Sequence, residues 1–206
     1  TADALIVALG SELAPEALAG FVDAAHDIYS VDGAAGCARA LDSFRGGRVV
    51  VAVSGLPFKC PAAPYEAALL LDDELRRRGV RDSTEIDLYT PEPLPMPVAG
   101  PALGAAVTGL LEARSIRFHP ATLIARCEPG TREVVTAGGD RVVYDLLAAV
   151  PPHRPPSALR GSGLVNEAGW IPVDRHTLAT SFEGVYAVGD ATSIGLANGK
   201  LLPKAG

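Results

Sequence analysis

A cysteine and its neighbours are the first candidate for chemistry in this sequence. Cys60 stands in the stretch KCPAAPYE, directly after Lys59, and Pro64 follows where a helix is predicted to begin. A neighbouring positive charge and the positive end of a helix both favour the thiolate, which is the nucleophilic form of cysteine. The stretch therefore predicts a reactive thiol. The alternative is a small buried apolar residue, which is what a lone cysteine often is.

A glycine and an aspartate are the second candidate. In TSFEGVYAVGDAT, which runs from Thr180 to Thr192, a short strand is predicted to end at Gly189 and Asp190. Such an ending places a carboxylate at the carboxyl edge of a sheet, beside a glycine that lets a ligand approach the backbone. The structural alternative is an aspartate that only caps a turn.

The elements around Cys60 read as strand, loop and helix. Val49 to Val53 is a nearly unbroken apolar run, typical of a strand buried on both faces of a parallel sheet. The helix that follows has Pro64 in its first turn and stops at Gly79. A dinucleotide-binding unit carries G-x-G-x-x-G in this loop, whereas here only Gly55 remains among prolines. The loop thus has the position of a cofactor site and the chemistry of a thiol site.

The remaining pattern alternates strands and helices, which predicts an α/β fold. Before the central strand we expect a strand and then a connector that contains one helix. After the central helix we expect a strand, a helix, an extended segment, a hairpin and further short strands. The corresponding residues are 4–9 (strand), 17–44 (connector, helix over 33–42), 85–90 (strand), 103–113 (helix), 117–126 (extended), 133–136 with 141–144 (hairpin), 170–173 and 184–188 (strands).

Composition excludes several classes of function. The chain has 206 residues, 48% of them hydrophobic, a net charge of -6 and a pI near 5.2. An acidic chain lacks the clustered Lys and Arg that nucleic-acid binding needs. No apolar stretch reaches the roughly 18 residues that span a bilayer. Cys37, Cys60 and Cys127 are too few and too widely spaced for a disulfide scaffold or a zinc site, and we expect no metal.

Several motifs resemble one superfamily of flavin enzymes. TSFEGVYAVGDAT resembles the second flavin-binding motif of FAD-dependent pyridine nucleotide-disulfide oxidoreductases, and ADALIVALG at the start resembles the segment with which that superfamily leaves its FAD domain. KCPAAPYE, VPPHRPP, GWIPVD and NGKLLPKAG resemble the branch of sulfide:quinone oxidoreductases and flavocytochrome c sulfide dehydrogenases. The resemblance spans nearly the whole chain.

The resemblance implies an architecture. It predicts a Rossmann-like central domain with a degenerate NAD-type loop, plus part of a discontinuous FAD-binding domain. We expect an exit strand of the FAD domain and a connector over 1–44, the NAD-binding-like domain over 45–153, and the C-terminal part of the FAD domain over 154–206. The chain lacks an initiator Met and the first FAD fingerprint, so we expect a piece of a longer protein.

The resemblance also implies roles. Cys60 matches the redox-active cysteine, Asp190 with Gly189 would bind the ribitol of FAD, and Lys204 in PKAG would lie near the isoalloxazine ring. The implied activity is two-electron transfer from sulfide or a small sulfur species, through thiol and flavin, to a quinone or a cytochrome. Neither Cys37 nor Cys127 matches the family's partner cysteine, and Cys127 is interpreted as structural.

Two other functions stay open. An NADH:quinone oxidoreductase of the same superfamily would need a pyrophosphate site after Val53, which the prolines of the loop oppose. The isolated chain is expected to be an inactive piece without bound FAD, because half of the flavin site is missing. Peripheral membrane contact through a further C-terminal segment and a homo-oligomer are left open, and a cytoplasmic location or one at the inner membrane is favoured.

Overall fold

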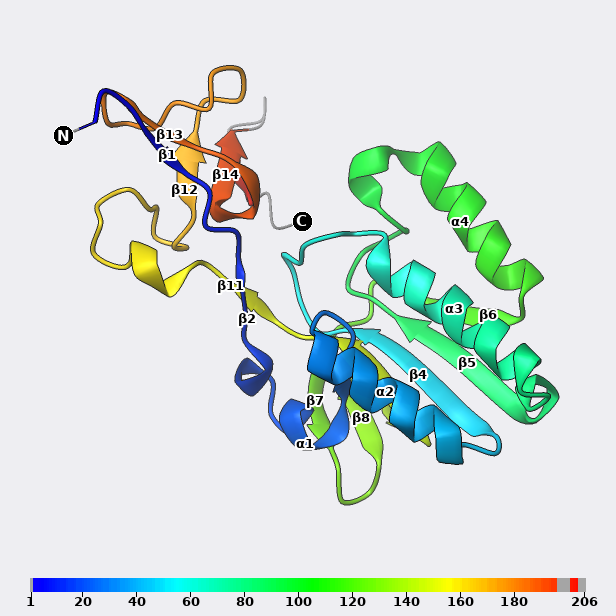
Figure 1. Ribbon diagram of the computed structural model, residues 1–206. Coiled ribbons are helices and arrows are strands. Elements are labelled where there is room, and N and C mark those ends of the chain that lie inside the picture. The colour runs from blue at the N-terminus through cyan, green and yellow to red at the C-terminus, as the bar shows by residue number, and fades with distance from the viewer. Residues whose placement is uncertain (1, 196–200, 204–206) are drawn as a thin grey trace. The chain divides into compact units, whose positions relative to one another are not determined.

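The computed structural model describes residues 2–195 and the backbone of residues 201–203. By their contacts the residues fall into two units (Figure 1). We call Pro15–Gly55 with Pro61–Pro152 the sheet unit, and Thr1–Ala14 with Leu56–Cys60 and His153–Gly206 the outer unit. The chain passes from one unit to the other after residues 14, 55, 60 and 152. In the described part of the chain, no helix has the length and apolar character that a membrane crossing requires.

The sheet unit is built on a five-stranded sheet in the order β3-β10-β4-β5-β6, in which every neighbouring pair is parallel. Helix α3 joins β4 to β5, α4 joins β5 to β6, and an antiparallel sheet of β7, β8 and β9 precedes β10. The bounds are α1 Phe21–Ala24, β3 His26–Asp27, α2 Val31–Ser43, β4 Gly47–Val53, α3 Ala63–Arg77, β5 Thr84–Tyr89, α4 Pro101–Ala113, β6 Ile116–His119, β7 Ile124–Glu128, β8 Glu133–Thr136, β9 Arg141–Val143 and β10 Leu146–Val150.

Alternating side chains of the sheet enter two separate cores. Val49 and Val51 of β4 pack with residues of α2, α3 and α4 on one face. Val50 and Ala52 pack on the other face, against α1 and the small antiparallel sheet. Since successive side chains of a strand point to opposite faces, a strand covered on both faces must be apolar throughout. This explains why the run at residues 49–53 predicts a central parallel strand, and the α/β class with a Rossmann-like sheet is confirmed.

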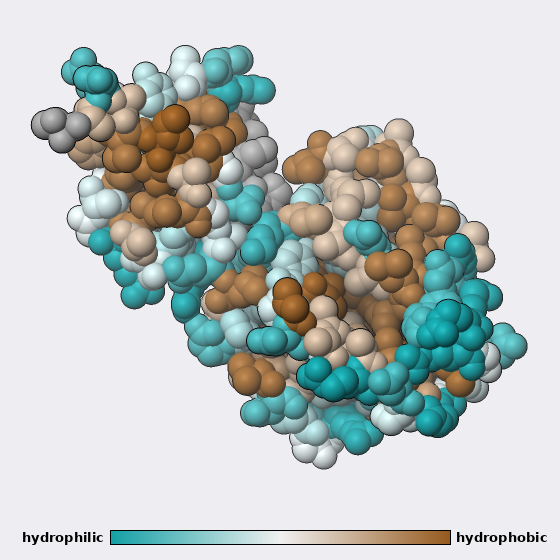
Figure 2. All heavy atoms as spheres, viewed as in Figure 1, coloured by the Kyte–Doolittle hydropathy of each residue, from teal (hydrophilic) through white to brown (hydrophobic). Residues whose placement is uncertain are grey.

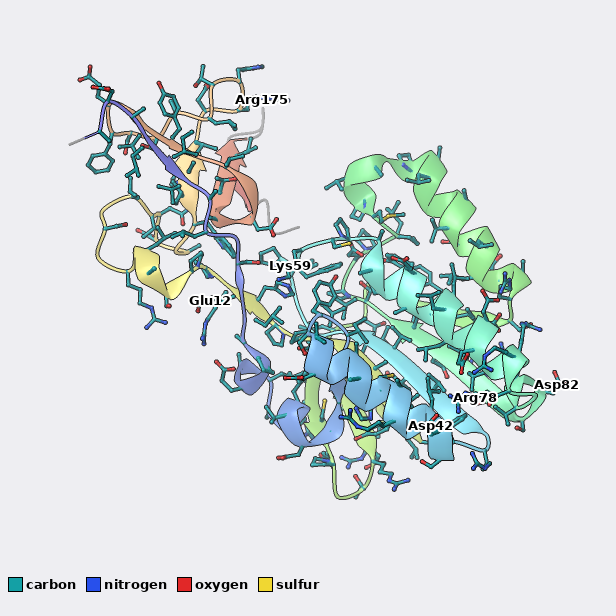
Figure 3. The ribbon with its side chains drawn as sticks, viewed as in Figure 1. Glu12, Asp42, Lys59, Arg78, Asp82 and Arg175 are labelled. Carbon is teal, nitrogen blue, oxygen red and sulfur yellow. The ribbon has the colours of Figure 1, made fainter. Side chains whose placement is uncertain are left out.

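Helix α3 follows its predicted course closely. Pro64 lies in its first turn, where a missing N–H breaks no helical hydrogen bond. After the last turn the N–H of Gly79, with φ of 70°, donates to the carbonyl of Arg76 at 3.0 Å. Arg78 ties this end of α3 to the end of α2, because its guanidinium bonds to the carbonyl of Leu41 at 2.7 Å and to Asp42 at 3.0 Å (Figure 3).

The outer unit consists of short strands rather than one continuous sheet. β1 (Leu5–Val7) pairs in parallel with β13 (Val185–Ala187), and β2 (Glu12–Leu13) pairs in antiparallel fashion with β11 (His153–Arg154). A third sheet contains β12 (Ile171–Val173), β14 (Thr192–Gly195) and β15 (Leu201–Pro203). The core of the outer unit is small, and comprises Val7, Leu159, Ile171, Val173, Ala187 and Ala191.

Apolar side chains lie exposed over the β1–β13 pair. Leu5, Ile6 and Val188 are exposed, Ile6 to 69%, and Figure 2 shows apolar residues gathered on this part of the outer unit. The strand at residues 4–9 therefore buries Val7 but leaves its neighbours in solvent.

The structure groups residues 15–44 differently from the sequence analysis, which placed them with the exit strand of the FAD domain. They join the sheet unit because β3 extends the parallel sheet beside β10, and because Cys37 and Leu41 of α2 enter the core with β4. A two-residue strand such as β3 has no periodicity that a sequence pattern could reveal. The division into segments by function stays a prediction.

Candidate functional site

Cys60 lies in the loop between β4 and α3, where the order of the sheet reverses. β4 leads through α3 to β5 on one side, while β10 lies on its other side, with Val150 opposite Val53. The N–H of Ser54 donates to the carbonyl of Val150 at 3.1 Å, so the carboxyl ends of the two strands stay together. Ligands of open α/β sheets bind outside the carboxyl ends of the strands at such a reversal. The loop at residues 54–62 thus starts from the position where this fold builds its sites.

The loop itself holds Cys60 in an unusual backbone conformation. Cys60 has φ of 51°, a left-handed conformation that residues other than glycine, asparagine and aspartate seldom adopt. Its side chain is exposed, whereas Phe58, two residues earlier, is almost fully buried and anchors the loop. Lys59 comes from the same loop (Figure 3). The predicted reactive thiol at Cys60 is compatible with this exposure, and its catalytic role stays a prediction.

The other two cysteines lie in the interior. Cys37 is buried in α2 and Cys127 in β7, and burial raises the pKa of both thiols, that of Cys127 to about 11. A thiol with a raised pKa stays protonated and unreactive at neutral pH. Among these three cysteines, all in the described part of the chain, no disulfide is present. The described residues also contain no cluster of His, Cys, Asp and Glu that could hold a metal ion.

Gly189 and Asp190 follow the carboxyl end of β13, as the sequence predicts. The N–H of Val188 donates to the carbonyl of Val7 at 3.0 Å, and the chain then enters a 3-10 turn, Gly189–Ala191. Gly189 has φ of 78°, and no heavy atom lies within 4 Å of the place that a Cβ would take. The backbone is therefore bare and open here, as close approach of a ligand requires.

The carboxylate of Asp190 is half-buried and has no bonding partner within the described part of the chain. The 3-10 turn at Gly189–Ala191 is closed by Thr192 and not by Asp190, since the hydroxyl of Thr192 donates to the carbonyl of Gly189 at 2.7 Å. The hydroxyl oxygen of Ser193, on the next residue, is buried and likewise makes no hydrogen bond in the structure described. Buried polar groups are usually bonded, and a carboxylate with no bond inside the described chain can accept one from a hydroxyl group of a ligand. Gly189 and Asp190 thus fit the ribitol-binding role that the sequence resemblance implies.

Three further residues stand in the motifs of the sequence analysis. Glu66 lies exposed in the first turn of α3. His153 lies half-buried in β11, opposite Leu13 of β2. Lys204, expected near the isoalloxazine ring, lies outside the described residues.

The sequence analysis missed the hydrogen bonds that link β2 to β11 and to the residues that follow β11. Oε1 of Glu12 accepts hydrogen bonds from the N–H and the hydroxyl of Ser157, both at 2.7 Å, and Oε2 accepts one from Arg154 at 3.0 Å (Figure 3 labels Glu12). The hydrogen bonds from Ser157 and Arg154 lower the pKa of Glu12 to about 2. The partners are more than 140 residues apart in sequence, so no local pattern could have revealed them.

The structure groups Cys60, Gly189 and Asp190 in the outer unit, although they come from distant parts of the chain. The arrangement offers an exposed thiol and, separately, a bare glycine with a carboxylate acceptor. The first group can form and break bonds to sulfur, and the second can hold a hydroxylated ligand.

Comparison with known proteins gives a consistent result. Residues 1–204 match the family model of the pyridine nucleotide-disulphide oxidoreductases. The chain is 25% identical over 207 residues to the mitochondrial sulfide:quinone oxidoreductase of Mus musculus and 27% identical over 203 residues to that of Dictyostelium discoideum. These alignments cover 92% and 93% of this chain and 44% of each relative, so the chain spans less than half the length of the curated relatives it matches.

Solved structures show the same fold. The sulfide:quinone oxidoreductase of Aquifex aeolicus superposes with a TM-score of 0.77 at 24% identity, covering 92% of this chain and 46% of that one. An NAD-dependent persulfide reductase from A. fulgidus superposes with a TM-score of 0.67 at 20% identity, covering 98% of this chain and 36% of that one.

Proposed function

Since the chain belongs to the pyridine nucleotide-disulphide oxidoreductase family, we propose that it is part of an FAD-dependent oxidoreductase of the sulfide:quinone type. The names of the relatives from Mus musculus and Dictyostelium discoideum support this branch of the family, as do the motifs around Cys60. The proposed substrates are sulfide or a small sulfur species as donor, and a quinone or a cytochrome as acceptor.

One observation carries the proposal. The loop after β4, which in a dinucleotide-binding unit presents glycines to a pyrophosphate, here presents an exposed cysteine in a left-handed conformation. Pro57, Pro61 and Pro64 offer no N–H to a phosphate. The position is therefore better suited to sulfur chemistry than to a second nucleotide.

The proposed chemistry at Cys60 balances as a two-electron oxidation. A cysteine thiolate and a hydrosulfide ion would form one S–S bond, giving a persulfide anion, one proton and two electrons. FAD, when bound, supplies the acceptor for the electron pair, and a quinone takes up the pair and two protons as quinol. The part of this chain is to hold the thiol at Cys60 and to accept a ribitol hydroxyl at Asp190, with Lys204 proposed near the ring.

The test is sulfide-dependent reduction of a soluble quinone by the complete protein that contains this chain. We expect Cys60→Ser to lose nearly all turnover, because a hydroxyl cannot form a persulfide, while bound flavin is retained. Cys127→Ala, which removes a buried thiol, is the control and should retain turnover. Unchanged turnover in Cys60→Ser would contradict the proposal, and NADH oxidation at rates that match sulfide oxidation would favour the NADH:quinone alternative.

Location and assembly belong to the same proposal. We propose a cytoplasmic protein or one at the periphery of the inner membrane, since a quinone acceptor is lipid-soluble. Fractionation of cells followed by a carbonate wash would test this, because a peripheral protein is released by the wash and a cytoplasmic one never sediments with the membrane. Sedimentation analysis would show whether the protein forms a homo-oligomer.

A further inference from the structure

The start of α3 has no capping side chain. Its N-cap residue, Ala62, has φ of -79° and ψ of -26°, and no side chain bonds to the N–H groups of the first turn in the part of the chain that is described. Capping side chains normally fix such a turn, and their loss costs a helix about 1 kcal/mol. Something else must therefore hold the first turn of α3 in place.

Tyr65, in that first turn, is held by a buried hydrogen bond. Its side chain is 2% exposed, and its hydroxyl donates to Oε2 of Glu92 at 2.6 Å. The ring also lies edge to face against Phe118 of β6, with the centroids 6.1 Å apart. Tyr65 and Glu92 are 27 residues apart in sequence, so the bond fastens the start of α3 to a different element.

Glu92 belongs to the segment that follows β5, and this segment is itself anchored. Glu92 is 4% exposed, its N–H donates to Oγ1 of Thr90 at 3.2 Å, and its carbonyl accepts from Ala121 at 2.8 Å. The N–H of Thr90 donates to the carbonyl of His119, the last residue of β6, at 3.2 Å. Burial raises the pKa of Glu92, partly opposed by hydrogen bonds from Tyr65 and Thr90. The pair thus ties α3 to the edge of the sheet.

The orientation of Glu92 differs from what a nucleotide-binding unit needs. In such a unit an acidic residue after the second strand of the fold bonds to a ribose hydroxyl. Here β5 is that strand, and the nearby Glu92 turns inward to Tyr65. The acid is used for internal support of α3 and is closed to a ligand.

The first turn of α3 is linked to Cys60 by a short and stiff connection. Only Pro61 and Ala62 stand between Cys60 and Ala63, the first residue of α3, and the ring of Pro61 fixes its own φ near -65°. A change in the first turn of α3 must therefore change the backbone at Cys60, which already has a left-handed conformation.

We propose that Tyr65 and Glu92 are positioning residues for Cys60, because their buried hydrogen bond fixes the first turn of α3 and with it the entry of the Cys60 loop into the helix. The inference rests on the proposed role of Cys60 as the reactive thiol. The proposal predicts that the reactivity of Cys60 depends on the hydrogen bond between Tyr65 and Glu92, although neither side chain bonds to the thiol.

The test measures alkylation of Cys60 by iodoacetamide in the chain as it stands, as a function of pH, with peptide mass spectrometry to separate Cys60 from Cys37 and Cys127. We expect Tyr65→Phe to slow alkylation of Cys60 at pH 7 by roughly twofold to fivefold, about the size of one interaction at a helix N-terminus. Tyr144→Phe removes the hydroxyl of another buried tyrosine of the sheet unit and should leave the profile unchanged.

Two variants of Glu92 separate positioning from a general loss of stability. Glu92→Gln keeps an acceptor for Tyr65 and should preserve the profile of Cys60, whereas Glu92→Leu, similar in size, should reproduce Tyr65→Phe. If Glu92→Leu and a folded Tyr65→Phe both keep the wild-type profile, the proposal is overturned, whatever the quinone assay shows. If the alkylation rates change as expected but Cys60→Ser still reduces quinone with sulfide, the positioning stands and the proposed function fails.

Discussion

A buried carboxylate of the sheet unit and two polar groups of the outer unit differ in how they are bonded. In the sheet unit the carboxylate of Asp72 is fully buried, yet it bonds to Arg76, Arg81 and Arg114. In the outer unit Asp190 and the hydroxyl of Ser193 have no partner within the described residues. Since an unpaired buried polar group costs free energy, a fold keeps it only where something else can use it. Asp72 is thus satisfied within the fold, whereas Asp190 and Ser193 keep bonding capacity that a ligand could use.

The largest expected effect comes from breaking the buried ion pair of the sheet unit. Arg81 is nearly buried, bonds to Asp72, and also donates to the carbonyl of Thr84 at 2.7 Å and to that of Arg114 at 2.8 Å. We expect Arg81→Ala to lower the free energy of unfolding by about 3–5 kcal/mol, because it leaves a buried carboxylate with poorer compensation. Urea denaturation measures this loss.

Arg76→Ala is the matched control for Arg81→Ala. Arg76 bonds to the same carboxylate at 2.8 Å, but its side chain is half-exposed and water can replace it. We expect a much smaller loss of stability. Equal losses in the two variants would show that burial is not what distinguishes these arginines.

A smaller effect is expected at low pH. Burial acts to raise the pKa of Asp87, but hydrogen bonds from Arg117 and His119 outweigh it and hold the pKa below its ordinary value. A carboxyl group whose pKa is lowered by folding stabilises the fold above its unfolded pKa of about 3.9, and this contribution is lost as the pH falls through the folded value. Asp87→Asn should therefore cost about 2 kcal/mol at pH 7.

The same variant should also flatten the fall in stability below about pH 4, since its amide does not titrate. Urea midpoints measured from pH 7 down to pH 3 check both parts. If the urea midpoint of the variant falls below pH 4 as steeply as that of the unmodified chain, the pH dependence comes from other carboxylates.

The smallest effect is expected in the outer unit. Asp190→Asn should change the free energy of unfolding by no more than about 0.5 kcal/mol, because no described group bonds to this carboxylate. Asp174→Asn is the contrasting variant, since Asp174 accepts hydrogen bonds from the N–H groups of His176 and Thr177 at 3.0 and 2.8 Å, and its loss should be measurable. Thermal melts of both variants measure these losses, and a large loss for Asp190→Asn would place Asp190 among the structural residues.

The sequence revealed the elements whose pattern is local. β4, α3 and the hairpin of β8 and β9 are each marked by periodicity, a proline or glycines, and the structure has them within a few residues of their predicted bounds. The extended segment predicted at 117–126 proved to be two strands, β6 and β7, because the chain turns at Pro120 and Ala121 from the parallel sheet into the antiparallel one. Pro120 is the residue-type signal for this break, because a proline cannot donate to the ladder of a continuous strand.

The candidate site was predictable only in part. Cys60, Gly189 and Asp190 stand in motifs of adjacent residues, so sequence alone pointed to them. The bond between Tyr65 and Glu92 and the bonds of Glu12 with Ser157 join distant segments, and a buried Glu looks like any surface Glu in the sequence. Likewise, no residue type in the loop predicts the left-handed backbone at Cys60, which the surrounding loop imposes.

The interleaving of the two units has a consequence for synthesis on the ribosome. All five strands of the parallel sheet have been made once residue 150 has emerged, so the sheet unit can fold while the rest of the chain is still being translated. β1, in contrast, precedes the whole sheet unit in the chain, but its partner β13 begins only at Val185. The strand with Leu5 and Ile6 must therefore wait until the sheet unit and Val185 have been made before it can pair, and this is the period in which a chaperone would be most useful.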